Sequence, residues 1–167
     1  MDNLEIIKEI LAQHKAIFGQ LESAHESVND MEALLRLEKA RSDLTSNVRQ
    51  TLSQKRDQLE KIITPLDRGL RKHYAFEEEN LPPLLGRVLT EALFFEHKQL
   101  LFQMEQTSSL IFTIKVKGLT RAQEMEKESL IYEQLDSLRR NKLDHLNREE
   151  AVLLTLQNVL QFQTKIR

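Results

Sequence analysis

The chain has 167 residues, of which 30% are charged and 40% hydrophobic, and its 24 basic and 26 acidic side chains give a formal net charge of −2. This length suffices for a buried core, and we predict a single domain over residues 1–167. With this near-neutral charge, the chain lacks the excess of basic residues that is typical of nucleic-acid-binding proteins. The absence of cysteine excludes disulfides, thiolate-held zinc, iron–sulfur clusters and cysteine nucleophiles.

The sequence predicts long helices outside any membrane. Gly and Pro are scarce, at 4 and 3 residues, while Leu, Glu, Lys and Gln are abundant. Residues 1–5 have no basic segment followed by an apolar run, so we expect no signal peptide. No apolar stretch approaches the ~18 residues of a membrane-spanning helix. We therefore expect a cytoplasmic protein with no membrane contact.

The first two helical regions follow from the spacing of apolar residues and from helix breakers. The first runs from about residue 3 to 25, and His14 and His25 share its apolar stripe. The sequence Ser-Val-Asn-Asp at 27–30 interrupts this pattern, and its Asn or Asp could cap the second helical region. That second region covers residues 31–79, with a turn or helix restart at 42–47 and an expected kink at Pro65.

Two further helices complete the pattern. Pro82 and Pro83 stop the second region, and a third helix spans roughly residues 87–115. Gly118 separates it from a fourth helix, which begins near Thr120 and runs toward the end of the chain. We predict an all-α, up-down-up-down four-helix bundle with a kinked second helix and a long fourth helix. The charged stretches 124–128 and 139–142 are interpreted as solvated faces, and Phe94, Phe95 and Phe102 as core.

Histidines occupy places in the apolar stripes where aliphatic residues are expected. An imidazole buried among leucines costs free energy unless its nitrogens find partners. One such histidine is ordinarily a core residue bonded to a backbone carbonyl, whereas one on each of four helices favours a shared site. The five histidines are His14, His25, His73, His97 and His145.

Two of these histidines are followed by a carboxylate on the same helical face. Glu77 lies four residues after His73, and Glu149 lies four residues after His145, with Glu150 beside it. Such a pair can place two ligands on one metal ion, and carboxylates can bridge two ions in a bundle core. The alternative is a metal-free bundle whose histidines form hydrogen bonds within the core.

The depth of each histidine along its helix separates candidate ligands from bystanders. At ~1.5 Å per residue, His14 and His97 lie ~15 Å into their helices. His73 lies near the end of the second region, which is at the same end of an up-down bundle. His25 would lie ~16 Å further along, which makes it a bystander near the helix end. His145, roughly two dozen residues into the fourth helix, fits this estimate least well.

Four short segments, one on each predicted helix, combine the histidines and glutamates with their neighbours. They are Ile10-Leu-Ala-Gln-His14-Lys-Ala-Ile17, His73-Tyr-Ala-Phe-Glu77-Glu78-Glu79-Asn-Leu81-Pro82, Glu96-His97-Lys-Gln-Leu100 and His145-Leu-Asn-Arg-Glu149-Glu150. Together they resemble the hemerythrin family, the bacterial HHE cation-binding domains in particular. Members of this family are four-helix bundles with an oxo- or hydroxo-bridged di-iron centre, and they are implicated in oxygen binding, oxygen or nitric oxide sensing, iron handling and repair of iron centres.

The resemblance implies a specific metal site. Glu77 and Glu149 would be bridging carboxylates, with Glu150 as an alternative to Glu149. The cofactor would be two non-haem irons, although zinc or manganese accept the same ligands, and the small ligand would be dioxygen or nitric oxide. The implied metal ligands are His14, His73, Glu77, His97, His145 and Glu149.

One departure from the family pattern bears on function. Leu101 stands where the oxygen-carrying pattern has a second histidine on the third helix. Fewer imidazoles argue against reversible oxygen carriage and favour a redox sensor, a site that exchanges iron, or a weak mixed-metal site. The loss also fits a degenerate bundle that binds no metal and serves as an interaction module, for example a homodimer through the long helices. Nothing in the sequence supports a substrate pocket, so an enzyme is not favoured.

Overall fold

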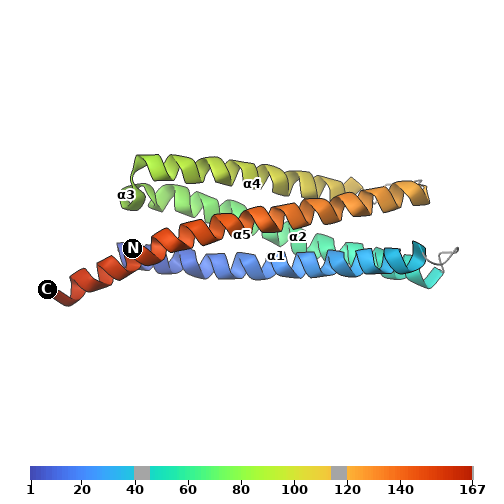
Figure 1. Ribbon diagram of the computed structural model, residues 1–167, viewed down its shortest axis with the longest axis horizontal. Helices are drawn as coiled ribbons and strands as arrows, with labels where there is room; N and C mark the ends of the chain where they lie inside the picture. Colours follow the sequence, from blue (N-terminus) through green and yellow to red (C-terminus); the bar gives the residue numbers. More distant parts are fainter. Residues whose placement is uncertain (40–45, 114–119, 167) are drawn as a thin grey trace.

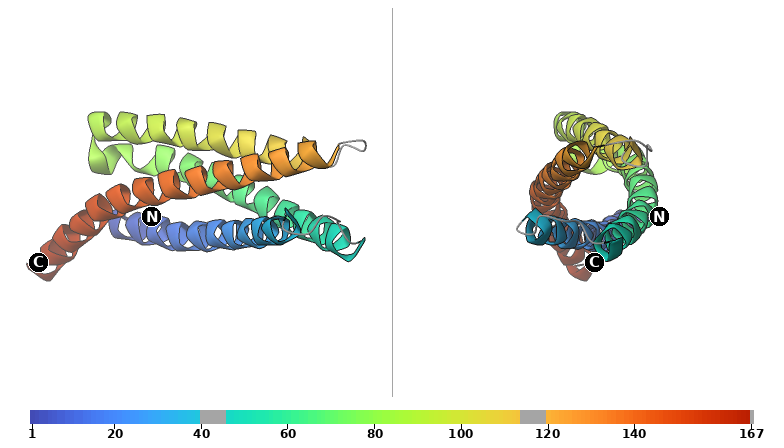
Figure 2. Two further views of the ribbon diagram at one scale, coloured as in Figure 1. Left: turned by 45° about the vertical axis from the view of Figure 1, so that its right-hand side comes forward. Right: turned by 90° about the vertical axis from the view of Figure 1, so that its right-hand side faces the viewer.

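The computed structural model describes residues 1–39, 46–113 and 120–166, which form five helices and no strand. Helix α1 (Asn3–Lys39) packs against α2 (Ser46–Asn80) and α5 (Arg121–Ile166), and α4 (Arg87–Thr113) packs against the same two helices (Figure 1). The fifth element, α3 (Pro82–Leu85), joins α2 to α4. Seen along its length, the molecule has its four long helices around a common interior (Figure 2). The predicted all-α helical bundle is confirmed.

Two of the long helices begin with reciprocal caps that the local sequence supplies. The backbone N–H of Glu5 donates to the Asp2 carboxylate over 2.8 Å, and the N–H of Asp2 donates to the Glu5 carboxylate over 3.0 Å. Thr120 and Gln123 repeat this exchange before α5, at 2.9 and 3.4 Å. Each exchange satisfies a backbone donor that the first helical turn leaves unpaired. The predicted start of the last helix near Thr120 is therefore correct.

The predicted end of the first helix near residue 25 is wrong, because α1 continues for 37 residues to Lys39. Val28 and Met31 are both 2% exposed and extend the buried stripe across the supposed interruption. The polar residues there lie outward, and the Ser27 hydroxyl donates to the carbonyl of Ser23 within the helix. Residues 31–39 thus belong to α1 rather than to the second region. The turn predicted at 42–47 falls mostly outside the described residues.

The predicted helix stop at the paired prolines is correct, but a short helix comes directly after it. Helix α2 runs through Pro65 and ends at Asn80, and the bend at Pro65 stays a prediction. The four residues of α3 then lead to Gly86, whose φ of 74° reverses the chain into α4. Helix α5, at 46 residues, matches the predicted long last helix, and its C-terminal end continues past the end of the bundle (Figure 1).

Buried apolar side chains form two clusters separated along the bundle axis. The central cluster holds Ile17, Leu21, Ala24, Val28, Leu59, Ile63, Leu66, Leu70, Tyr74, Leu100, Met104, Ile111, Ile131, Leu135 and Leu138. The end cluster holds Ile6, Ile7, Ile10, Leu81 and Leu153. On α1, α2 and α5, a buried histidine or glutamate lies between the residues of the two clusters. The core is therefore two apolar layers with a polar layer between them.

Four predictions about single side chains are wrong. Phe95 and Phe102, expected in the core, are 63% and 59% exposed on α4. Lys142 and Glu128, expected on solvated faces, are buried. Glu128 pairs with Arg56 of α2, whereas Lys142 lies beside the polar layer. The apolar stripe of α5 carries both residues inward, since a helical face is set by spacing and not by charge.

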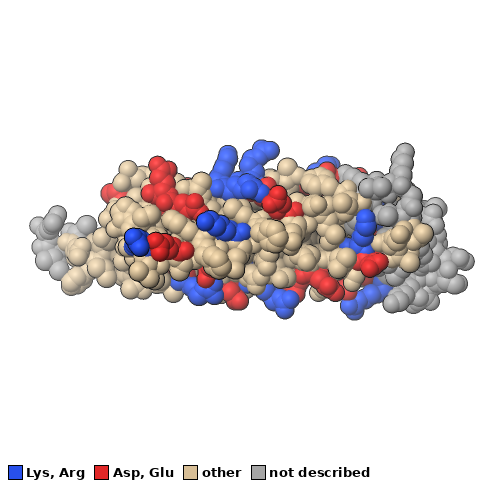
Figure 3. All heavy atoms as spheres, turned by 90° about the horizontal axis from the view of Figure 1, so that it is seen from above, with Lys and Arg blue, Asp and Glu red and all other residues tan. Residues whose placement is uncertain are grey.

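Among the described residues, no helix is long and apolar enough to cross a bilayer. On the face drawn in Figure 3, basic and acidic side chains are interspersed. The predicted lack of nucleic-acid binding stays a prediction.

Replacing Leu135 with alanine should lower the free energy of unfolding by about 2–5 kcal/mol, because Leu135 is fully buried in the central cluster. Leu130→Ala on the same helix should cost less than about 1 kcal/mol, since Leu130 is 40% exposed. Urea unfolding followed by circular dichroism measures both. Equal losses in the two variants would contradict the assignment of the central cluster.

Candidate metal centre

The polar layer contains one histidine from each long helix. His14 lies on α1 between Ile10 of the end cluster and Ile17 of the central cluster. His97 on α4, His73 on α2 and His145 on α5 lie at the same level, and all four are at most 1% exposed. Their three- and four-residue spacing from buried neighbours directs the imidazoles inward with the apolar stripe. The bundle thus brings four buried imidazoles together.

Glu77 lies among three of these imidazoles. Its Oε1 is 3.1 Å from Nε2 of His14 and 2.8 Å from Nε2 of His73. Its Oε2 is 3.2 Å from Nε2 of His97. One oxygen of this fully buried carboxylate therefore faces histidines of α1 and α2, and the other faces the histidine of α4. A carboxylate that bridges two metal ions would need this arrangement.

Glu149 approaches the same centre from α5. Its Oε2 lies 3.3 Å from Nε2 of His14 and 3.4 Å from Nε2 of His145. Glu150, the alternative weighed from the sequence, has its Oε1 3.3 Å from the other ring nitrogen of His14 and is 40% exposed. Of the two neighbouring glutamates, Glu149 is therefore the one inside.

The outward ring nitrogens of the histidines face a second set of acceptors. Nδ1 of His145 lies 2.8 Å from Glu96, and Nδ1 of His73 lies 3.1 Å from the Gln13 amide oxygen. Nδ1 of His14 and of His97 face Glu150 at 3.3 Å and Glu78 at 3.6 Å. At His14, His73 and His145 the outer acceptor is within hydrogen-bonding distance of Nδ1, and a proton held there leaves Nε2 as a free lone pair, the usual arrangement of metal-binding histidines. Nδ1 of His97 makes no hydrogen bond within the described residues.

Sequence reasoning gave three of these outer partners no role and assigned Glu150 only as a substitute for Glu149. A local signal was present, because each partner is the sequence neighbour of an inner residue. Gln13 precedes His14 and Glu96 precedes His97, while Glu78 follows Glu77 and Glu150 follows Glu149. However, each partner contacts the ring of a different helix, and that pairing depends on the packing of helices.

The inner atoms fit a metal ion better than they fit one another. Nε2 of His73, His97 and His145 and both oxygens of Glu149 make no hydrogen bond within the described residues, despite their short separations. Buried polar atoms without partners are rare in folded proteins. Two cations beside the two carboxylates would satisfy these atoms together.

The ligand atoms form two overlapping groups. His14, His73, Glu77 and Glu149 form one, and Glu77, His97, His145 and Glu149 form the other, each with one ligand atom per residue within 4.8 Å of the rest. With metal–ligand bonds of ~2.1 Å, atoms on opposite sides of an ion are ~4.2 Å apart. All six residues predicted from the sequence therefore come together at a suitable spacing, and their role as ligands stays a prediction.

Electrostatics in the metal-free site are dominated by the two carboxylates. Burial opposes protonation of His14, but Glu149 and Glu77 outweigh it and raise the pKa of His14 to about 9. Burial lowers the pKa of His73, which Glu77 only partly offsets. Burial likewise opposes ionisation of Glu77 and Glu149, yet the surrounding imidazoles hold the pKa of both below the ordinary value. The carboxylates are therefore anionic and ready for a cation.

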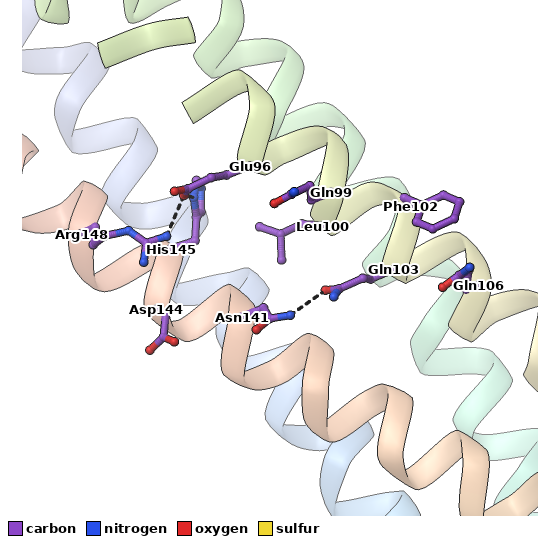
Figure 4. Close-up of a pocket in the computed structure, with 10 residues that line it drawn as sticks. All are labelled: Glu96, Gln99, Leu100, Phe102, Gln103, Gln106, Asn141, Asp144, His145 and Arg148. Carbon is purple, nitrogen blue, oxygen red and sulfur yellow. Dashed lines mark hydrogen bonds and ion pairs between the residues drawn. The ribbon is translucent and has the colours of Figure 1, made fainter. Parts of the chain in front are cut away.

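Two solvent-facing pockets are each lined by one histidine of the polar layer. A pocket of about 500 Å³ between α4 and α5 is lined by His145 together with Glu96 and Arg148, and Phe102 lies further along it (Figure 4). A second pocket, of about 400 Å³ between α1 and α5, is lined by His14 and Glu150. Small molecules can therefore approach one histidine of each group.

Two sequence-based expectations concern residues outside this layer. His25 is within α1 rather than near its end, and its Nε2 lies 3.4 Å from Asp136, away from both ligand groups. Leu101 packs against the central cluster, so this position offers apolar contact and no ligand atom.

No protein-family model, curated protein or solved structure matches the chain.

Metal binding should displace a proton from His14. Its raised pKa of about 9 keeps it protonated at pH 7 in the metal-free protein. Zinc binding at pH 7 should therefore release at least about one proton per chain, and zinc affinity should rise with pH up to about 9. Calorimetry in two buffers of different ionisation enthalpy measures the release, and a buffer-independent enthalpy would contradict it.

The same shift predicts how pH affects the metal-free fold. The folded-state pKa of His14, about 9, lies above the ordinary value of 6.5. Its contribution to stability is therefore fully present below pH 6.5 and is lost as pH rises through about 9. The lowered pKa of Lys142, about 8, acts in the opposite direction over the same pH range, so the test compares two proteins. Between pH 6.5 and 9, urea unfolding in the presence of chelator should give a larger loss of stability for the wild type than for His14→Gln, and equal changes in the two proteins would contradict the assignment.

Proposed function

We propose that this chain is a non-haem di-iron protein of the hemerythrin type, with an up-down-up-down four-helix bundle around the metal site. One observation carries the proposal: four buried imidazoles direct Nε2 at two buried carboxylates, and in three of them an outer acceptor lies within hydrogen-bonding distance of Nδ1. The order of the motifs along the chain, which resembles that family, supports the same conclusion.

Each residue has a defined part in the proposed site. His14 and His73 would hold one iron, and His97 and His145 the other. Glu77 and Glu149 would bridge the two ions, and the outer acceptors would fix the imidazole rings. When bound, the iron pair supplies redox chemistry toward dioxygen or nitric oxide. Zinc or manganese accept the same nitrogen and oxygen ligands.

The proposed use of the site is sensing or scavenging of dioxygen or nitric oxide, or the handling of iron. Two histidines per ion, with Leu101 adding no ligand, leave more coordination positions open than a histidine-rich carrier would. The pockets beside His145 and His14 would admit a small molecule from solvent. Reversible oxygen carriage is the use that the ligand set supports least.

Metal analysis tests the proposal directly. Protein made in iron-supplemented cells should contain close to two irons per chain, and His73→Ala/Glu77→Ala should contain close to none, because that variant removes a bridge and a terminal ligand. His25→Ala is the matched control, since His25 lies outside both ligand groups, and it should keep the wild-type content. A folded, helical wild type without bound metal would overturn the proposal.

A second candidate, a metal-independent interaction module, is favoured by the apolar surface of α4. Val88, Phe95 and Phe102 recur at seven-residue intervals and are 81%, 63% and 59% exposed. An exposed stripe of this kind fits a partner helix or a second copy of the chain. Light scattering with and without chelator tests it: an oligomer that persists in chelator and dissociates on Phe95→Glu would support it, and a monomer would exclude self-association.

A further inference from the structure

Lys142 is a buried cation without a hydrogen-bond partner. It is 1% exposed, and its Nζ has no acceptor within the described residues. It lies over the ring of Tyr74, with Nζ 4.7 Å from the ring centroid. A cation–π contact offsets part of the cost of burying an ammonium, but the three N–H donors remain unused.

Tyr74 connects this lysine to the candidate metal centre. Its ring stacks on the imidazole of His97 at a centroid distance of 4.0 Å and lies edge-on to His145 at 6.0 Å. The Tyr74 hydroxyl also has no hydrogen-bond partner among the described residues. Lys142 precedes His145 by three residues on α5, so it faces the same interior. Two unused donors thus adjoin the centre on its central-cluster side.

The charges near Lys142 belong to the same centre. Burial lowers the pKa of Lys142 to about 8, and the leading opposing influences are the carboxylates of Glu77 and Glu149. Burial, and after it the same two carboxylates, raise the pKa of the Tyr74 hydroxyl. Lys142 and Tyr74 therefore both lie within the field of the proposed bridging ligands.

The proposed ions leave room for a further ligand. Each would receive two imidazole nitrogens and one oxygen from each of two carboxylates, which is four protein atoms. Iron and similar ions in such sites accept up to six ligands, so positions stay open. Leu101 packs into the central cluster and offers no ligand atom. The unused polar groups on that side are donors, which suit an anion.

We propose that Lys142 and Tyr74 form a subsite for a small monoanion bound to the metal pair, with Lys142 Nζ and the Tyr74 hydroxyl donating hydrogen bonds to it. The inference rests on the proposed metal binding. The ligand class is a compact anion such as hydroxide or azide, because a buried layer between packed helices excludes larger ones. Lys142 is a positioning residue, since it holds the anion and does not bind the metal.

Cobalt(II), which binds the same nitrogen and oxygen ligands, allows a test without redox chemistry. Wild-type protein and the variants Lys142→Met, Tyr74→Phe and Lys98→Met are loaded with cobalt, and the cobalt content is measured first. Azide is then titrated while the visible cobalt spectrum is followed. Lys98→Met is the matched control, because it removes the same charge from an exposed position beside His97.

We expect two cobalt ions per chain in all four proteins. Azide affinity should fall by about tenfold or more in Lys142→Met and by about two- to tenfold in Tyr74→Phe, and it should stay within about twofold in Lys98→Met. Tyr74→Phe keeps the test informative if Lys142→Met does not fold.

Three outcomes would overturn the anion subsite. Unchanged azide affinity in both Lys142→Met and Tyr74→Phe would show that neither residue holds the anion. Loss of cobalt from a folded Lys142→Met protein would instead make Lys142 a metal ligand. A wild type without cobalt would overturn the proposed function itself, and the subsite with it. The cobalt content therefore separates the failure of one proposal from the failure of the other.

Discussion

The burial of two carboxylates in one layer of the core is the constraint on which the other features depend. Glu77 and Glu149 are at most 1% exposed and share the imidazole of His14 between them. Two like charges away from water are costly unless protons or cations compensate them. The raised pKa of His14 shows how the metal-free chain compensates, by keeping one imidazole charged.

The apolar clusters bound this layer on both sides along the bundle axis. The end cluster covers it near the start of α1, and the central cluster fills the bundle beyond it. Each long helix contributes to the layer, so a shift of one helix by a single turn would replace an imidazole or carboxylate with an aliphatic side chain. The polar layer thus favours one register of the four helices, a role that buried polar groups also have in coiled coils.

Sequence reasoning found the inner residues because their signal is local. A histidine and a glutamate four residues apart on a buried stripe can be recognised without knowing the fold, as at His73 and His145. The misplaced end of α1 also explains the poor depth estimate for His145. His14 lies 25 residues before Lys39, where α1 ends, and His145 lies 24 residues after Arg121, where α5 begins. With α1 at its full length, His14 and His145 are therefore at nearly equal distances from these two helix ends.

The outer partners depend on contacts between helices, which spacing alone does not encode. Glu96 and Glu78 belong to charged surface positions, and only the packing of α4 against α5 and α2 turns them toward an imidazole. The spacing along the last helix places Lys142 on the apolar stripe, but the charged stretch 139–142 predicts a solvated face, because lysine is rarely buried without a partner. Its position therefore departs from an otherwise reliable rule.

The two halves of the chain supply equivalent ligands in the same order. In each half a single histidine comes first, and a histidine–glutamate pair follows on the next long helix. In the proposed site, the inner residues would therefore give each metal position the same set of donor atoms, two imidazole nitrogens and two carboxylate oxygens. The outer partners break this symmetry, since a neutral Gln13 amide faces one ring while carboxylates face the other three. In the proposed site, this outer set would therefore give the two metal positions different charge surroundings.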